Sequence, residues 1–150
     1  MKCLKLIFCL LYLCCSLAEA KEVQVDAQKE VDEMTGRLVA SYLEAKVDED
    51  IIAGYASALR SDGSFPDLDY VTVHEGSSYP AGSHLKRLKL MAIAYRKPGN
   101  KYYNSGRLLK QIVAGIDYWY RVRPKSGNWW FGDIGAPQDY MVPLILLKGK

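Results

Sequence analysis

At 150 residues the chain has room for one domain at most. Its formal net charge is +3, from 20 lysine and arginine residues against 17 aspartate and glutamate residues. No long basic block occurs, which argues against a nucleic-acid partner. The basic cluster Lys86, Arg87 and Lys89 falls in a helical run, where a solvated helix face is the simpler interpretation.

The first twenty residues have the pattern of a secretory signal peptide. Lys2 and Lys5 supply a positive start, the apolar run 6–13 follows, and Ala18-Glu19-Ala20 is a small-x-small cleavage site. The apolar run is too short to span a bilayer as a stable helix. We therefore expect cleavage after Ala20 and a secreted or periplasmic mature protein, residues 21–150.

The cysteines all fall in the segment expected to be removed, at Cys3, Cys9, Cys14 and Cys15. A lipoprotein signal at Cys14 or Cys15 fits less well, because Leu13 stands where a small residue is usual. Without cysteine, the mature chain can have no disulfide, cysteine nucleophile or thiolate metal site. Its stability must come from a packed core, for which about 130 residues suffice.

The mature chain predicts helices and no strand. Apolar residues at three- and four-residue steps mark amphipathic helices over roughly 26–46 and 51–59. The glycine- and proline-containing segment 62–83 is expected to be a long irregular loop, and long loops are often functional. A third helix, capped by Ser83, ends before Pro98. The stripe expected to be buried in the first helix is Val31, Met34, Leu38, Tyr42 and Ala45. The stripe expected in the third helix is Leu85, Leu88, Ala92 and Tyr95, with Met91 beside it.

Two further helices complete the predicted elements. Asn104 or Ser105 can cap the fourth helix, which closes at Arg123-Pro124. Pro137 suits the first turn of the fifth helix, and Pro143 would either kink that helix or fall in its first turns. The fourth helix is expected to bury Leu108, Leu109, Ile112, Ile116 and Trp119. The fifth is expected to bury Met141, Leu144 and Ile145. Unequal connections favour stacked helical hairpins over a tight four-helix bundle.

Two adjacent tryptophans, Trp129 and Trp130, stand between glycines in the segment 126–137, where no clear periodicity occurs. Neighbouring residues of one element point in different directions, whereas a glycine-flanked loop can aim both indoles freely. Such a loop suits a flat, partly apolar ligand such as a sugar ring. The alternative is burial between two helices, the role expected for Trp119.

The other candidate polar groups have simpler interpretations. Asp62, Asp67 and Asp69 lack the spacing of a calcium loop and are expected to form turns and caps. His84 starts a helix and is expected to pack or lie at the surface, whereas His74 could face a cleft. One loop histidine without a partner at ligand spacing makes no metal site, so neither a metal nor a cofactor is expected.

Three islands of sequence, 62–70, 84–95 and 128–137, resemble in order and spacing the N-terminal helical domain of family 8 polysaccharide lyases. These are the chondroitin AC, hyaluronate and xanthan lyases. The Asn-Trp-Trp island with its Ile-Gly-Ala-Pro ending is the most specific of the three. The resemblance covers nearly all of 21–150, and it implies an all-α fold, the N-terminal portion of an incomplete α/α toroid built of helical hairpins.

The resemblance also implies a chemistry. The family cleaves uronic-acid-containing polysaccharides by β-elimination, using an asparagine, a histidine, a tyrosine and an arginine that lie further downstream, beyond Lys150. Trp129 and Trp130 match tryptophans that contact sugar rings, and Asn128 matches the residue that precedes them and helps to shape that wall. The expected site is therefore a substrate-binding one, with no catalytic residue in this chain.

The sequence is compatible with functions from different classes. The chain is expected to be the N-terminal part of a secreted polysaccharide lyase, inactive alone and, if a fragment, missing downstream toroid and β-sheet domains. The alternative is a non-catalytic secreted glycan-binding protein. Both take an acidic polysaccharide as partner. A plain helical scaffold with buried tryptophans is a third possibility.

Overall fold

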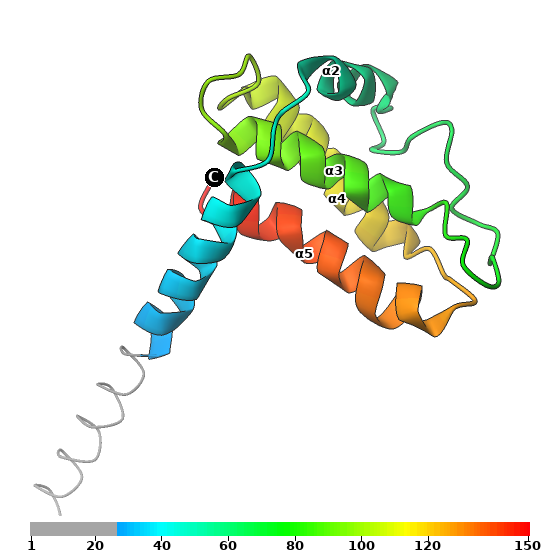
Figure 1. The fold of residues 1–150 in the computed structure, drawn as a ribbon. Helices are drawn as coiled ribbons and strands as arrows, with labels where there is room; N and C mark the ends of the chain where they lie inside the picture. Colours follow the sequence, from blue (N-terminus) through cyan, green and yellow to red (C-terminus); the bar gives the residue numbers. More distant parts are fainter. Residues whose placement is uncertain (1–26) are drawn as a thin grey trace, which may run out of the picture. The chain divides into compact units, whose positions relative to one another are not determined.

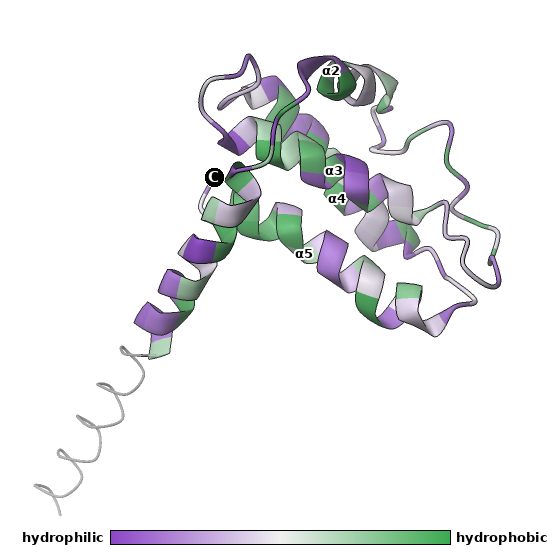
Figure 2. Cartoon of the chain, in the orientation of Figure 1, coloured by the Kyte–Doolittle hydropathy of each residue, from purple (hydrophilic) through white to green (hydrophobic). Residues whose placement is uncertain are grey.

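A computed structural model describes residues 27–150, so the signal peptide expected at 1–20 lies outside the described residues. The chain divides after residue 40 into two units, which we describe separately. The first helix covers 27–43, close to the predicted 26–46. Apolar and hydrophilic residues alternate along it, as Figure 2 shows, and Val31, Met34 and Leu38 are exposed rather than buried as expected.

In the second unit, from Ser41 to Lys150, the helices are arranged around one central helix, α3 (Gly82–Arg96). The others are α2 (Glu49–Ala58), α4 (Gly106–Val122), the short π-helix η1 (Phe131–Gly135) and α5 (Ala136–Leu147). Helix α3 packs against α2, α4 and α5 (Figure 1). It forms an antiparallel hairpin with α4, and α5 runs alongside it. No strand occurs among residues 27–150, so the all-α class is confirmed.

Helix α3 is buried on several sides because it has three helical neighbours. The predicted stripe is confirmed, since Leu85, Leu88, Met91 and Ala92 have no exposed surface. Ser83 as the N-cap is wrong, because the helix already begins at Gly82 and no side chain caps it. The preceding turn replaces the cap: its carbonyl groups accept hydrogen bonds from the first three N–H groups of the helix.

Helix α4 follows the predicted pattern closely. The Ser105 hydroxyl accepts a hydrogen bond from the N–H of Leu108 at 3.3 Å, as an N-cap does. The helix ends at Val122, before Arg123, which takes a left-handed conformation with a φ of 47°. Its buried apolar residues are Leu108, Ile112, Ile116 and Trp119. The remaining residue of the predicted stripe, Leu109, is only partly buried.

The fifth helix departs from the prediction in the face that it buries. Val142, Pro143 and Leu146 are buried, whereas Met141 and Leu144 are 53% and 43% exposed. The predicted stripe is therefore wrong for these two residues. The physical reason is that the second half of α5 is mostly hydrophobic all round (Figure 2), so periodicity alone cannot select a face.

The long segment between α2 and α3 is held by its own polar groups. The Asp62 carboxylate accepts hydrogen bonds from the N–H and hydroxyl of Ser64, and Asp69 accepts from the N–H groups of Val71 and Thr72. The turn roles predicted for Asp62 and Asp69 are confirmed, whereas the carboxylate of Asp67 pairs with Arg87. At Gly63, φ is +91° and an added Cβ would lie 2.1 Å from the carbonyl oxygen of Ala114. Only glycine therefore allows this segment to lie so close to α4.

His84 joins three parts of the second unit. Its side chain is fully buried. Its Nδ1 lies 2.9 Å from the hydroxyl of Tyr70, and its Nε2 lies 2.9 Å from the carbonyl oxygen of Gly115. Because that carbonyl can only accept, Nε2 carries the proton and Nδ1 accepts from Tyr70. The Tyr70 oxygen in turn accepts from the N–H of Phe65. Every polar atom in this series of hydrogen bonds has a partner only when the imidazole is neutral.

Acidification should therefore destabilise the fold through His84. Burial is the main cause that lowers the pKa of His84 to about 4, against an ordinary value of 6.5. Between these two values the unfolded chain binds more protons than the folded chain, so stability falls as pH drops through this window. Between pH 7.5 and pH 5, His84 should account for a loss of about 2 kcal/mol in the free energy of unfolding. Urea unfolding at both pH values measures it.

The matched variants are His84→Gln and His74→Gln, which change the two histidines of the chain. On acidification, the free energy of unfolding of His84→Gln should fall by about 2 kcal/mol less than that of the unchanged protein. That of His74→Gln should fall by nearly as much as in the unchanged protein. If His84→Gln does not fold, Tyr70→Phe, which removes the donor to Nδ1, should destabilise by about 1–3 kcal/mol at pH 7.5. An equal acid response in both histidine variants would contradict this role of His84.

Candidate functional site

The two adjacent tryptophans lie in a helical turn and not in a loop. Residues 129 and 130 are helical and continue through η1 into α5. The loop predicted for the two tryptophans is therefore wrong, whereas Pro137 falls in the first turn of α5 as predicted. The missed signal is Asn128, a good N-cap residue: its side-chain oxygen accepts a hydrogen bond from the N–H of Trp130 at 2.9 Å.

Asn128 also fixes the position of this turn against the long segment. Its side-chain amide donates to the carbonyl oxygen of Gly76 at 2.8 Å, and its own N–H donates to the hydroxyl of Ser126. The neighbouring Gly127 donates its N–H to the carbonyl oxygen of His74. Two segments far apart in the sequence are thereby held side by side at the start of the helical turn.

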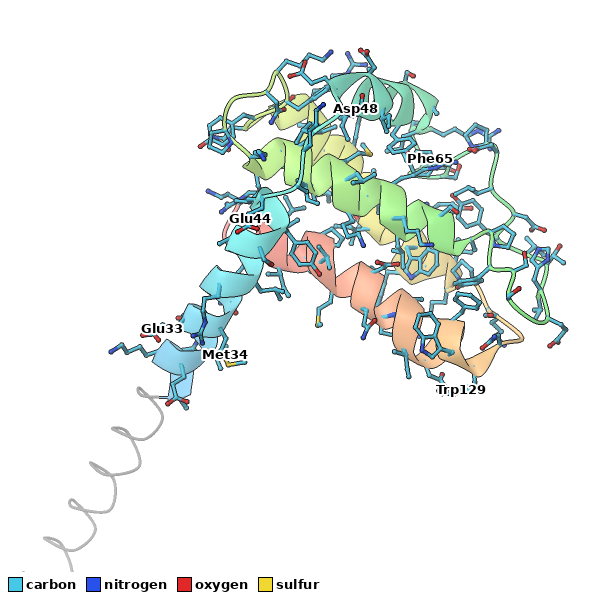
Figure 3. The ribbon with its side chains drawn as sticks, viewed as in Figure 1. Glu33, Met34, Glu44, Asp48, Phe65 and Trp129 are labelled. Carbon is cyan, nitrogen blue, oxygen red and sulfur yellow. The ribbon has the colours of Figure 1, made fainter. Side chains whose placement is uncertain are left out.

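The indoles of Trp129 and Trp130 are accessible. Trp129 is 67% exposed and lies at the start of the last helical run (Figure 3), and Trp130 is 45% exposed. Burial of both between helices is therefore wrong as an interpretation. Trp119 is only 8% exposed and belongs to the core, as predicted. We call Trp129 and Trp130 the aromatic wall.

Trp130 packs against Gly135 and Phe131. A Cβ added to Gly135 would lie 2.8 Å from Cζ3 of the indole, so the ring lies directly over this glycine. The ring of Phe131 meets the indole edge to face, with centroids 5.4 Å apart. The π-helical turn places residues 130 and 135 in this relation, and π-helical turns are frequent at functional sites.

A cavity of about 280 Å³ lies beside Trp130. The cavity is bounded by the end of the long segment, the first two turns of α3 and the helical run from Trp130 to Asp139. The polar and charged residues that line it are Ser77, Lys86, Gln138 and Asp139. Its aromatic lining is Tyr79, Trp130 and Phe131. The sequence interpretation missed all of these except Trp130, because they come from three separate segments.

The basic cluster of α3 is not one solvated face. Arg87 forms two hydrogen bonds with the carboxylate of Asp67 and lies 4.7 Å from the centroid of the Phe65 ring. Lys89 pairs with Asp139 at 2.8 Å. The solvated-face interpretation is therefore wrong for Arg87 and Lys89. Lys86 is exposed, as expected, but it lines the cavity.

The site offers binding groups rather than an acid–base pair. Both ring nitrogens of His84 are used in the core, and the Tyr79 hydroxyl donates to the carbonyl oxygen of Pro124 at 3.0 Å. Burial raises the pKa of Tyr79, which disfavours a phenolate there. His74 lies 3.6 Å from Asp69, and no metal-binding group of three or more His, Cys, Asp or Glu occurs in the described part of the chain.

Comparisons with known proteins identify what this fold resembles. Residues 26–150 match the family model described as polysaccharide lyase family 8, N terminal alpha-helical domain. Chondroitinase-AC of Pedobacter heparinus is 34% identical over 92 residues, which are 61% of this chain and 13% of that protein. Hyaluronate lyase HylB of Enterococcus faecalis is 28% identical over 93 residues, 57% of this chain and 9% of the relative.

A solved structure of chondroitinase AC lyase, from a study of its oligosaccharide complexes, matches with a TM-score of 0.69 at 28% identity. The match covers 77% of this chain and 17% of that chain. The predicted fold, an incomplete α/α toroid built of helical hairpins, is confirmed by this likeness. The chain thus spans only 9–17% of the length of the relatives and the solved chain that it matches. No helix in the described residues is both long and apolar enough to cross a membrane.

The orientation of Trp130 should depend on Gly135. In Gly135→Ala the new methyl group would overlap the indole, so the ring must move outward and become more accessible to an aqueous quencher. Gly132→Ala is the matched control in the same π-helix, because nothing lies within 4 Å of its Cβ position. Iodide quenching of tryptophan fluorescence should rise in Gly135→Ala and stay unchanged in Gly132→Ala. Identical quenching in the two variants would contradict the described packing.

Proposed function

Because this chain belongs to polysaccharide lyase family 8, as part of its N-terminal α-helical domain, we propose that it supplies the aromatic substrate-binding wall of a lyase. The substrate is a uronic-acid-containing polysaccharide of the chondroitin, hyaluronan or xanthan type, and the reaction is β-elimination. The observation that carries the proposal is the exposure of two adjacent indoles, Trp129 and Trp130, beside a cavity with polar lining.

The wall suits a sugar ring for a physical reason. An indole offers a large, flat apolar face, and the C–H groups on one face of a pyranose can cover it while the hydroxyl groups stay hydrated. Half-exposed indoles fixed on a helix lose little conformational freedom on binding, which favours affinity. We propose that Trp129 and Trp130 contact successive parts of the polysaccharide.

Asn128 belongs to the same proposed site, as a positioning residue. Its side-chain oxygen holds the turn that carries Trp130, and its amide holds Gly76. Since both ends of this side chain already have protein partners, its contribution to binding passes through the orientation of the aromatic wall.

We propose that residues 27–150 bind the polysaccharide without cleaving it. β-Elimination needs groups that stabilise the charge developing on the uronate carboxylate, and a base positioned at the C5 proton. In the described part of the chain, the buried histidine His84 and the cavity tyrosine Tyr79 are committed to structural hydrogen bonds. The same observation favours the second candidate, a non-catalytic glycan-binding protein.

Export is part of the proposal. The charge, apolar run and small-residue site of 1–20 support a signal peptide cleaved after Ala20, which leaves 21–150 as the N-terminal portion of the toroid domain. Expression with the native leader in a bacterium should yield a periplasmic or secreted protein whose first residue is Lys21. A retained Met1 in the cytoplasm would contradict export.

Binding to hyaluronan and chondroitin oligosaccharides tests the aromatic wall. Trp129→Ala and Trp130→Ala should each weaken binding about fivefold or more in calorimetry, since truncating an important aromatic contact costs more than about 1 kcal/mol. Tyr103→Ala is the matched control, because Tyr103 is 46% exposed but lies between α3 and α4, outside the cavity lining. Unchanged affinity in both tryptophan variants would overturn the proposed site.

A second arm of the experiment separates binding from cleavage. The same mixtures are followed for the absorbance of unsaturated uronate products, and none is expected from this chain alone. Product formation would contradict the proposed lack of catalysis and would leave the binding role standing.

A further inference from the structure

The cavity beside Trp130 has a size that fits part of one sugar residue and not a longer segment. Its volume is about 280 Å³, close to the lower end of small-molecule sites, which run from roughly 300 to 1,000 Å³. One of its sides is the indole of Trp130, and Tyr79 and Phe131 continue the aromatic surface with ring centroids 5.7 Å apart. A ring stacked on Trp130 can therefore direct a substituent into the cavity.

The charges that line the cavity leave one positive charge uncompensated. The Asp139 carboxylate is paired with Lys89 at 2.8 Å, and both side chains are partly buried, with 24% and 28% of their surfaces exposed. Lys86 forms no ion pair with any described residue, although Arg87 and Lys89 of the same helix both do. The ammonium group of Lys86 is therefore available to a negatively charged group that enters the cavity.

The neutral polar groups of the cavity add directionality. Gln138 supplies an amide that both donates and accepts, and Ser77 supplies a hydroxyl. A carboxylate or a sulfate can accept hydrogen bonds from Ser77, Lys86 and Gln138. An uncharged hydroxymethyl group gains nothing from the Lys86 charge. The aromatic side and the cationic side together match a sugar that carries an anion.

We propose that the cavity is a subsite for the anionic substituent of the sugar residue that stacks on Trp130, with Lys86 as its counter-charge. This subsite rests on the proposed polysaccharide-binding function. It makes Lys86 a residue that determines specificity: it selects an acidic polysaccharide over a neutral one of the same ring size.

Calorimetric titration with four oligosaccharides of equal length tests the subsite. Hyaluronan and its carboxyl-reduced form differ by the carboxylate, and chondroitin and chondroitin sulfate differ by the sulfate. Lys86→Gln removes the charge, Lys86→Arg keeps it, and Lys110→Gln is the control for loss of an exposed lysine outside the cavity lining.

Lys86→Gln should weaken binding of hyaluronan about two- to fivefold, as expected for an accessible charge pair, and the loss should vanish at high salt. The variant should bind hyaluronan and its carboxyl-reduced form alike, and Lys86→Arg should restore the preference. A loss seen only with chondroitin sulfate assigns the subsite to sulfate, and a loss with hyaluronan assigns it to carboxylate.

Failure of the subsite is distinguishable from failure of the binding function. If Trp130→Ala weakens binding but Lys86→Gln acts like Lys110→Gln on every oligosaccharide, the subsite is overturned and the aromatic wall stands. If no oligosaccharide binds the unchanged protein, both proposals fall.

Discussion

The rest of the second unit depends on the two hydrogen bonds made by the neutral, buried imidazole of His84. It receives a hydrogen bond from Tyr70 of the long segment, and it gives one to the carbonyl oxygen of Gly115 on α4. A buried polar group without partners would cost several kcal/mol, so these bonds hold only if segment, α3 and α4 stay together. Stacking on the rings of Tyr118 and Trp119 adds a packing constraint in the same place.

The fixed start of α3 in turn determines the geometry of the candidate site. Gly82 allows the ring of Tyr79 to lie against the first turn of α3, since a Cβ there would meet Cδ1 of Tyr79 at 2.8 Å. Tyr79 then contacts Phe131 of η1, and the bond from Asn128 to Gly76 fastens the other side of the turn. Trp130 is thus placed by a framework that runs back to the core, which is what a preorganised binding surface requires.

The sequence predicts the helices well where periodicity is unambiguous, as in α3 and α4, whose buried stripes follow three- and four-residue steps. It fails where the pattern carries too little information. The second half of α5 is apolar all round, so its buried face is set by contact with α3 and not by sequence spacing. The helical start at Asn128 could not be recognised, because the glycines that flank the two tryptophans favour a loop. The cavity could not be predicted, because Ser77, Lys86 and Gln138 meet only through tertiary structure.

The proposed function requires that an acidic glycan bind at the aromatic wall and not elsewhere on the protein. The three tryptophans provide an internal comparison, since Trp119 is buried and Trp129 and Trp130 are exposed. The direct measurement is a titration of the ¹⁵N-labelled protein with hyaluronan oligosaccharides, following the three indole N–H resonances by NMR. The indole signals of Trp129 and Trp130 should shift progressively while that of Trp119 stays in place. Shifts confined to Trp119, or no shift in any indole while the ligand binds, would contradict binding at the aromatic wall.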